Sequence, residues 1–241
     1  MKLSVVVPAF NEERLLAGAL AAIRAALGGL EEAGWSAELI VCDNNSTDRT
    51  AEIARTAGAT VVFEPVNQIA RARNAGAAQA GGEWLAFVDA DSYPSRELFS
   101  DVLAAIRDGN ALAGGATVRI DTDDAMIRFW VASWNRLSRA MRWAAGSFIF
   151  CEARAFREIG GFSEALYAGE EIDLFRRLKR LARRRGQSVV ILHRHPLHTS
   201  DRKARLYTKR EHFTFMLKTL LLAGRPLRDR KSCYVWYDGR R

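Results

Sequence analysis

Two carboxylates stand directly behind an apolar segment of this chain. Asp89 and Asp91 follow the run Trp-Leu-Ala-Phe-Val, and Ser92 and Pro94 come soon after them. The run predicts a buried strand, and the residues behind it predict a turn. Because carboxylate oxygens are hard ligands, the pair predicts a site for a divalent cation that neutralises a phosphate-bearing ligand.

Alternating strands and helices are predicted to position that pair. Over the first part of the chain the pattern predicts strands at residues 2–8, 37–43, 60–64 and 83–89, and helices at residues 13–34, 46–59 and 69–82. We therefore expect an α/β fold, with a mostly parallel, Rossmann-like sheet flanked by helices on both faces.

Polar residues follow three of these strands, at the carboxyl ends where open α/β sheets bind ligands. They are Asn11 and Glu12 after the first strand, Asp43, Asn44 and Asn45 after the second, and the aspartate pair after the fourth. The turn after the first strand lacks the glycine fingerprint of dinucleotide sites, and the chain has no G-x-x-x-x-G-K loop. Phosphates would therefore need another source of positive charge, such as a cation.

The composition limits the class of protein. The chain has 241 residues, 49% hydrophobic content and a formal net charge of +8, which favours a folded protein with an anionic partner. No nucleic-acid-binding motif occurs, so no nucleic acid is expected. The three cysteines form no C-x-x-C pair, no signal peptide is evident and no apolar run reaches the length of a spanning helix, so we expect a cytoplasmic protein.

Five ordered blocks of the sequence resemble the nucleotide-sugar-dependent glycosyltransferases of family 2, which have the GT-A fold. The blocks are VVVPAFNEE, VCDNNSTDRT, ARARNAGAAQAGGEWLAFVDADS, GGF at 160–162 and GEEIDLFRRL from Gly169. We therefore expect a GT-A domain over residues 1–200, with residues 201–241 as a helical C-terminal extension packed on it. The resemblance also implies a metal-dependent, inverting hexosyltransferase that uses Mn²⁺ or Mg²⁺.

Taken position by position, the resemblance implies a donor site on the rim of the sheet. Asp89 would face the ribose, Asp91 the metal, and Asp43 would bond the base. The other implied contacts are Pro8, Ala9 and Glu12, which line the base and ribose pocket, and Arg73 and Asn74, which close the site. The chain departs from the family at Asn44, where relatives often have Asp or Gly.

The block from Gly169 supplies the catalytic base that the resemblance implies. Relatives usually have Glu-Asp there, with the Asp as base, and the matching residue here is Glu171, whose side chain is one methylene longer. In an inverting transfer this carboxylate takes the proton of the acceptor hydroxyl as its oxygen attacks the anomeric carbon. Glu170 and Asp173 are further candidates, although an acidic first turn also complements the dipole of the following helix.

Histidines and arginines belong to the next predicted strand and the segment behind it. His193 and His195 leave a β-type run at i, i+2 spacing, and in many relatives a histidine after this strand completes the metal or diphosphate shell. We expect one of the two to be a metal ligand, the alternative being a histidine bonded within a loop. Nearby basic residues are candidates either for the diphosphate or for a solvated face: Arg194, Arg202, Lys203 and Arg205.

Basic and aromatic segments also predict peripheral contact with an anionic membrane. The arginine-rich residues 176–185, the apolar run from Phe213 and the tail at 233–241 would form this surface, although a solvated helix face also explains the arginines. An amphipathic segment from residue 125 contains three tryptophans that are candidates for the core or for stacking on a sugar or lipid: Trp130, Trp134 and Trp143.

The sequence thus predicts a transferase with a nucleotide-sugar donor and a saccharide, lipid or small-molecule acceptor, acting on cell-envelope polysaccharide or glycolipid. It would work in the cytoplasm or at the inner face of the membrane. A second hypothesis, raised by Glu171 in place of the usual Asp, is a catalytically inactive nucleotide-binding or scaffold protein on the same fold.

Overall fold

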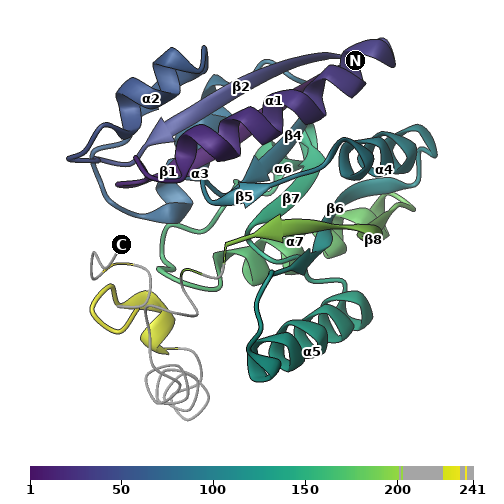
Figure 1. Cartoon of the computed structure of the whole chain (residues 1–241). Coiled ribbons are helices and arrows are strands. Elements are labelled where there is room, and N and C mark those ends of the chain that lie inside the picture. The colour runs from purple at the N-terminus through teal and green to yellow at the C-terminus, as the bar shows by residue number, and fades with distance from the viewer. Residues whose placement is uncertain (201, 203–224, 234–236, 238–241) are drawn as a thin grey trace.

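An eight-stranded sheet forms the centre of the molecule (Figure 1). The structure is a computed structural model, and it describes residues 1–200, 202, 225–233 and 237. The strands lie in the order β3-β2-β1-β4-β7-β6-β8-β5. Their bounds are β1 Lys2–Ala9, β2 Ser36–Asp43, β3 Thr60–Phe63, β4 Trp84–Val88, β5 Ser92–Tyr93, β6 Ala111–Arg119, β7 Phe148–Glu152 and β8 Ser188–Thr199.

The first half of the chain forms the predicted alternation of strands and helices. β1 pairs in parallel with β2 and β4, and β2 pairs in parallel with β3. The intervening helices are α1 (Leu16–Glu32), α2 (Thr50–Thr56) and α3 (Ile69–Gln79). α3 lies close to β1 because Gly76 has no side chain: a Cβ there would stand 2.4 Å from Cγ1 of Val6.

The second half of the sheet is mixed. β7 pairs antiparallel with β4 and β6, β6 pairs parallel with β8, and the short β5 pairs antiparallel with β8. Four of the seven strand pairings are parallel, which confirms the prediction of an α/β fold with a mostly parallel sheet. β6 contains Gly114 because the strand is crowded there: a Cβ would stand 2.5 Å from the Phe150 ring.

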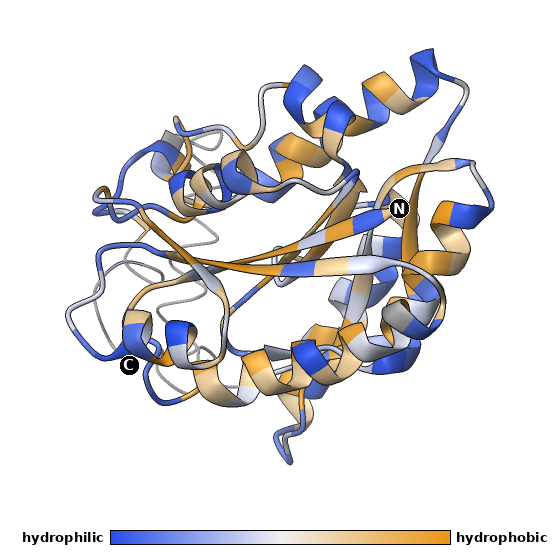
Figure 2. Cartoon of the chain, turned by 90° about the horizontal axis from the view of Figure 1, so that it is seen from above, coloured by the Kyte–Doolittle hydropathy of each residue, from blue (hydrophilic) through white to orange (hydrophobic). Residues whose placement is uncertain are grey.

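Helices cover both faces of the sheet, as predicted. Alternate residues of a strand point to opposite faces, so Val5 and Val7 of β1 pack in one buried cluster with α1 and with α4 (Arg96–Arg107). Val6 packs in a second cluster with α3, α6 (Ala153–Glu158) and α7 (Glu170–Arg184). In Figure 2 hydrophobic residues are concentrated on the strands, and polar residues mark many of the loops.

Helix α5 (Ala125–Met141) projects from the body of the molecule (Figure 1). Asp124 caps its first turn by accepting from two backbone N–H groups, at 2.7 and 3.2 Å. The Asn135 amide anchors the middle of the helix to β6 through two hydrogen bonds with the Val118 backbone. Of the predicted tryptophans, Trp134 packs against the buried cluster, whereas Trp130 is 55% exposed.

The predicted C-terminal extension falls largely outside the described residues, as do the apolar run from Phe213, Lys203 and Arg205. Its longest described stretch, residues 225–233, contains a 3-10 turn at Arg225–Arg228. Leu227 of this turn accepts a hydrogen bond of 2.7 Å from the N–H of Tyr167, which precedes α7. Among the described residues, no helix combines the length and the apolar character needed to cross a membrane.

Candidate active site

The carboxyl ends of β1, β2 and β4 meet at one rim of the sheet. β1 and β2 end in register, with Pro8 opposite Cys42 and Ala9 opposite Asp43. β4 lies on the other side of β1 in the same direction, and Asp89 follows its last residue. Parallel strands place these ends on one edge, so the residues predicted for the donor site share that edge.

Arg73 of α3 is the centre of a buried ion cluster on this rim, the Arg73 cluster of Arg73, Asp89 and Glu170. Its guanidinium donates to Asp89 Oδ1 at 3.0 Å and to Glu170 Oε1 at 2.8 Å. It also donates to the Gly146 carbonyl at 2.8 Å and lies over the Phe162 ring, 5.1 Å from the centroid. The Arg73 side chain is only 3% exposed, so packing as well as charge fixes the cluster.

Glu170 and Glu171 begin α7 in different surroundings. Burial and the neighbouring Glu171 carboxylate raise the pKa of Glu170 to about 8, although Arg73 acts in the opposite direction. Glu171 is half-buried, and a Cβ added to Gly146 would stand 3.8 Å from its carboxyl carbon. Glu171 is therefore the more exposed of the two carboxyl groups, and Glu170 is bonded to Arg73.

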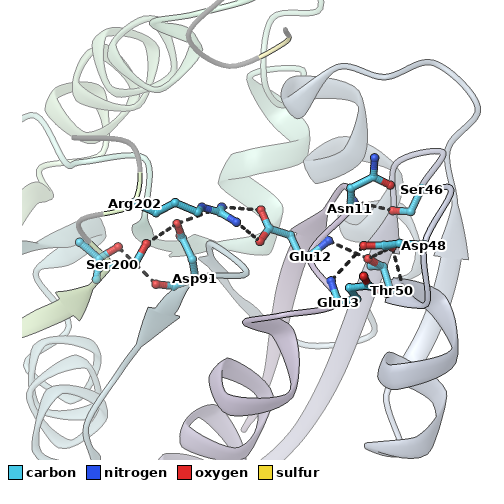
Figure 3. Close-up of polar contacts among 10 residues, drawn as sticks. Asn11, Glu12, Glu13, Ser46, Asp48, Thr50, Asp91, Ser200 and Arg202 are labelled. Atoms are coloured by element: carbon cyan, nitrogen blue, oxygen red, sulfur yellow. Dashed lines mark hydrogen bonds and ion pairs between the residues drawn. The ribbon is translucent and has the colours of Figure 1, made fainter. Parts of the chain in front are cut away.

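A second set of ion pairs, the Arg202 cluster, joins Arg202, Glu12 and Asp91 (Figure 3). The Arg202 guanidinium forms two hydrogen bonds of 2.6 Å with the Glu12 carboxylate and one of 3.3 Å with Asp91 Oδ2. The Ser200 hydroxyl donates to the same Asp91 oxygen at 2.8 Å. The guanidinium thus lies between two carboxylates, at the place where the sequence predicts a cation.

The loop that carries Glu12 is tied to the loop after β2 (Figure 3). The Glu12 N–H donates to the Thr50 hydroxyl at 2.8 Å, and the Asn11 N–H donates to the Ser46 hydroxyl at 3.0 Å. Within the second loop, Asp43 Oδ1 accepts from the Ser46 N–H at 3.0 Å. These bonds fix the backbone around two residues predicted to contact the donor.

Asn44, where the chain departs from the family, holds the loop before α3. Its amide donates to two carbonyls of that loop at 3.2 and 2.7 Å, and its Oδ1 accepts from the Gln68 N–H at 2.8 Å. The Gln68 amide in turn donates to the carbonyls of Glu164 and Leu166. These two side chains form an amide bridge from the end of β2 to the loop before α7.

Asn74 and Asp173 support the turn at 160–162. The Asn74 side chain bonds both the N–H and the carbonyl of Phe162, each at 2.9 Å. Asp173 pairs with Arg177 at 2.7 Å, and Arg177 donates to the carbonyls of Ile159 and Gly161. The structure therefore places both residues beside the turn that carries Phe162, and not in either ion cluster.

His193 and His195 lie in an irregular stretch of β8. The ladder with β6 is regular from Val189 to Leu192 and resumes at Leu197, so the histidines fall in the irregular stretch between. His195 Nδ1 is 3.0 Å from a carboxylate oxygen of Asp101 in α4. Among the described residues, no group of three or more His, Cys, Asp or Glu side chains is arranged to hold a metal ion.

Sequence reasoning missed two contributors to the rim, Gly146 and Ser200. Gly146 supplies the carbonyl that receives Arg73, and Ser200 supplies the hydroxyl that holds Asp91. No motif marks either residue, because only the fold brings it to its partner. The signal for Arg202 was its place in the basic segment behind β8, which made it a candidate for the diphosphate.

Comparison with known proteins identifies the family. The model of glycosyl transferase family 2 matches residues 4–158, more than half of the chain, so this chain belongs to that family of glycosyltransferases. The resemblance seen in the sequence is confirmed. Helix α7, which carries the predicted base, lies beyond the matched residues.

Two curated relatives match parts of the chain. An uncharacterized glycosyltransferase of Mycobacterium tuberculosis is 43% identical over 88 residues, which is 36% of each protein. The dolichol-phosphate mannosyltransferase of Pyrococcus furiosus is 31% identical over 124 residues, which cover 48% of this chain and 33% of the relative. The chain thus matches only about a third of the length of these relatives.

A solved structure shows the same fold. The mannosyltransferase from Pyrobaculum calidifontis, in complex with GDP-Man and Mn²⁺, has a TM-score of 0.65 at 19% identity. The likeness covers 90% of this chain and 60% of that one. It confirms the GT-A-like architecture that the sequence predicts.

Proposed function

We propose that this chain transfers a sugar from a nucleotide-diphosphate donor to an acceptor hydroxyl, with inversion at the anomeric carbon. The Arg73 cluster carries the proposal. It couples Asp89, on the donor side of the rim, to the first turn of α7, where Glu171 stands. A donor bound beside Asp89 would therefore lie next to a carboxylate that can accept a proton.

Glu171 is the proposed base. It takes the proton of the acceptor hydroxyl while that oxygen bonds to the anomeric carbon. The bond from this carbon to the diphosphate oxygen breaks, and its electron pair leaves with the nucleoside diphosphate. Glu170 is 4% exposed and bonded to Arg73, so it would hold α7 in position and not act on the acceptor.

The donor contacts inferred from the family stay part of the proposal. Glu12 and Asp43 have their backbones fixed on the rim by the two tied loops, and Pro8 and Ala9 end the adjacent strand. A nucleoside bound along these residues would leave its diphosphate near the aspartate pair that follows β4.

Mg²⁺ or Mn²⁺ suits the oxygen ligands of this rim. Such ions are commonly held by one or two carboxylates together with substrate phosphates and water, and Asp91, with Asp89 two residues before it, supplies carboxylates. When bound, the cation neutralises charge on the departing diphosphate. Arg202 would compete with such a cation for Asp91, because its guanidinium lies 3.3 Å from Asp91 Oδ2. His193 and His195 are not included in this ligand set.

The acceptor and the location also belong to the proposal. The Pyrococcus relative is named for dolichol phosphate, which supports a lipid or saccharide acceptor of the cell envelope. The formal net charge of +8 favours work near an anionic surface. We therefore propose a cytoplasmic protein that makes peripheral contact with the inner face of the membrane.

The test combines donor binding with turnover. Thermal unfolding with a panel of nucleoside diphosphates and their sugars, with and without Mn²⁺, should show a metal-dependent rise in Tm for one base, because a ligand that binds only the folded state stabilises it. Asp91→Asn should abolish the metal-dependent part of this rise in Tm. Glu171→Gln should keep the rise in Tm and lower kcat by about 100-fold or more.

Glu97→Gln is the matched control for the base. Glu97 is an exposed glutamate in the first turn of α4, as Glu171 is a glutamate in the first turn of α7, so its loss should change neither binding nor turnover. Nucleotide binding without turnover in the unsubstituted chain would favour the second hypothesis, an inactive nucleotide-binding or scaffold protein. No rise in Tm with any diphosphate would contradict the donor site itself.

A further inference from the structure

Helix α5 carries most of the exposed large apolar side chains of the described chain. Eight such side chains are exposed in the described residues, and five of them lie on this helix: Met126, Phe129, Trp130, Leu137 and Met141. Their exposure ranges from 42% to 64%. They occur at i, i+3, i+4, i+11 and i+15, so on a helix of 3.6 residues per turn they share one side, the outer face of α5.

An adjacent side of α5, about 100° around the helix from the outer face, is already used by the fold. Val131 and Trp134 pack against the buried cluster, and Ser138 is fully buried. The helix is therefore apolar on two sides, and within the described chain only the inner side has a partner. A surface helix normally turns polar residues to solvent, so the apolar outer face of α5, which has no partner among the described residues, is a candidate binding surface.

Cations occupy the polar side of α5, and Arg136, seven residues after Phe129, borders the outer face. Residues 125–147 contain no acidic side chain. Acidic residues precede the helix, and Asp124 among them is its N-cap. Four arginines lie within α5 or directly after it: Arg128, Arg136, Arg139 and Arg142.

The positive charge is densest at the C-terminal end of α5. Arg176 and Lys179 of α7 lie over the Trp143 ring, 5.7 and 5.4 Å from its centroid, and Lys179 donates to the Met141 carbonyl at 2.7 Å. The pKa of Lys179 is lowered by burial and then by the positive charges of Arg176 and Arg142. These cations therefore form one basic surface beside the outer face.

We propose that the outer face of α5 binds the surface of an anionic lipid bilayer. An apolar stripe with aromatic residues, on a helix whose polar side carries arginines, is typical of a helix that lies in the membrane interface, with its apolar side chains at the acyl boundary and its cations near lipid phosphates. A second copy of the chain fits this face less well. A symmetric contact would bring Arg136 and the basic surface of one copy towards those of the other.

The surface adjoins the candidate active site. Five residues after α5 ends, Gly146 accepts the hydrogen bond of Arg73, and Lys179 follows Glu171 about two turns along α7. Binding through α5 would bring Glu171 towards the boundary between lipid and water. This deepens the proposed function, on which it rests, by favouring an acceptor that is a lipid or is linked to one.

Vesicle binding tests the apolar part of this surface. The full chain would be sedimented with vesicles of phosphatidylcholine alone, or of phosphatidylcholine and phosphatidylglycerol in equal parts. We expect binding to the mixed vesicles that weakens as salt is raised. The double variant Phe129→Ser, Trp130→Ser should bind about tenfold more weakly or worse, because burial of two large side chains is lost.

Phe63→Ser is the matched control for the double variant. Phe63 is 60% exposed on β3, against 64% for Phe129 and 55% for Trp130 on α5, so all three side chains can be replaced without opening the core. The control should bind the mixed vesicles as the unsubstituted chain does.

Charge reversal tests the basic part. Arg136 and Arg24 are both exposed and both lie in the interior of a 17-residue helix, α5 and α1 respectively. Arg136→Glu should weaken binding to the mixed vesicles by about fivefold or more. Arg24→Glu reverses the same charge within a helix and should leave binding unchanged.

Three results would overturn the proposal. They are no binding to the mixed vesicles, equal binding by the double variant and Phe63→Ser, and a dimer in solution that the double variant loses. The nucleotide-dependent rise in Tm does not involve α5. If nucleotides raise the Tm but the chain does not bind vesicles, only the membrane surface is refuted. If the chain binds vesicles but no nucleotide raises its Tm, only the proposed function is refuted.

Discussion

The two ion clusters on the rim share a plan and differ in how they are held. Each joins one aspartate of the Asp-Ala-Asp segment to an arginine that also binds a glutamate. In each arginine the Nε atom is buried without a hydrogen-bond partner in the described chain. The members are Asp89, Arg73 and Glu170 in one cluster, and Asp91, Arg202 and Glu12 in the other.

The difference lies in the element that delivers each arginine. Arg73 comes from a helix packed against the sheet, lies over Phe162 and is 3% exposed, whereas Arg202 comes from the segment behind β8 and is 17% exposed. A guanidinium fixed by packing cannot move aside for another cation. We infer that the Arg73 cluster is a permanent support, and that Arg202 is exchangeable with another cation at Asp91.

The largest expected effect follows from replacing the fixed arginine. Arg73→Ala would leave the Asp89 carboxylate without its cation and the buried Glu170 carboxyl without its hydrogen bond, so the free energy of unfolding should fall by about 3–5 kcal/mol. Urea unfolding followed by circular dichroism measures this loss. If Arg202→Ala lost as much stability, the distinction between a fixed and an exchangeable arginine would fail.

The Arg73 cluster should also make stability depend on pH. The pKa of Glu170 is raised to about 8 from an ordinary value of 4.5, so the folded chain holds this proton more tightly than the unfolded chain does. The resulting stabilisation is complete below about pH 4.5 and is lost as the pH rises through about 8.

Glu170→Gln isolates this contribution. The free energy of unfolding of the unsubstituted chain, relative to that of Glu170→Gln, should fall across this window by at most about 1.4 kcal/mol per pH unit. Urea unfolding at a series of pH values provides the measurement. A difference that does not vary with pH would mean that Glu170 stays ionised beside Arg73 throughout.

Replacing Arg202 should cost less stability and strengthen metal binding. Arg202→Ala loses charged hydrogen bonds worth about 1–3 kcal/mol, but it also removes a cation that competes for Asp91. Mn²⁺ alone should therefore raise the Tm of this variant by more than that of the unsubstituted chain. Arg55→Ala serves as the control, and an unchanged response to Mn²⁺ would show that Arg202 and the ion do not compete.

Gly146 offers the smallest and most local change. A Cβ there would stand 3.2 Å from an Arg73 nitrogen and 3.8 Å from the carboxyl carbon of Glu171. Gly146→Ala should alter the free energy of unfolding by less than about 1 kcal/mol and lower kcat severalfold, because Arg73 must shift. Gly28→Ala, where nothing lies within 4 Å of an added Cβ, should leave kcat unchanged. Equal kcat values in the two variants would mean that Arg73 does not position the reacting groups.

The parallel half of the fold could be predicted because its signals are local. Each strand there is a short apolar run and each helix has its own periodicity, so β1 to β4 follow directly from the sequence. β6 gives no such signal, because Gly114 and Gly115 lower its strand propensity. Those glycines are required by contacts with Phe150 and Ala144, which lie far away in the sequence.

Single side chains of the site show the same limit, because their contacts also depend on segments that are distant in the sequence. Motif order identified both Arg73 and Asn74, but adjacent residues of a helix point in different directions. Packing alone decides that Arg73 enters the ion cluster while Asn74 bonds the turn at 160–162. Likewise, the irregular stretch of β8 that holds His193 and His195 depends on pairing with β6, which no local pattern records.

The amide bridge from Asn44 through Gln68 has a thermodynamic consequence. Under the proposed function it fastens the end of β2, on the donor side, to the loop before α7, on the acceptor side. A nucleotide that orders the first segment would lower the entropy that the second still has to lose. Such coupling is reciprocal, so each substrate should bind more tightly when the other is already bound.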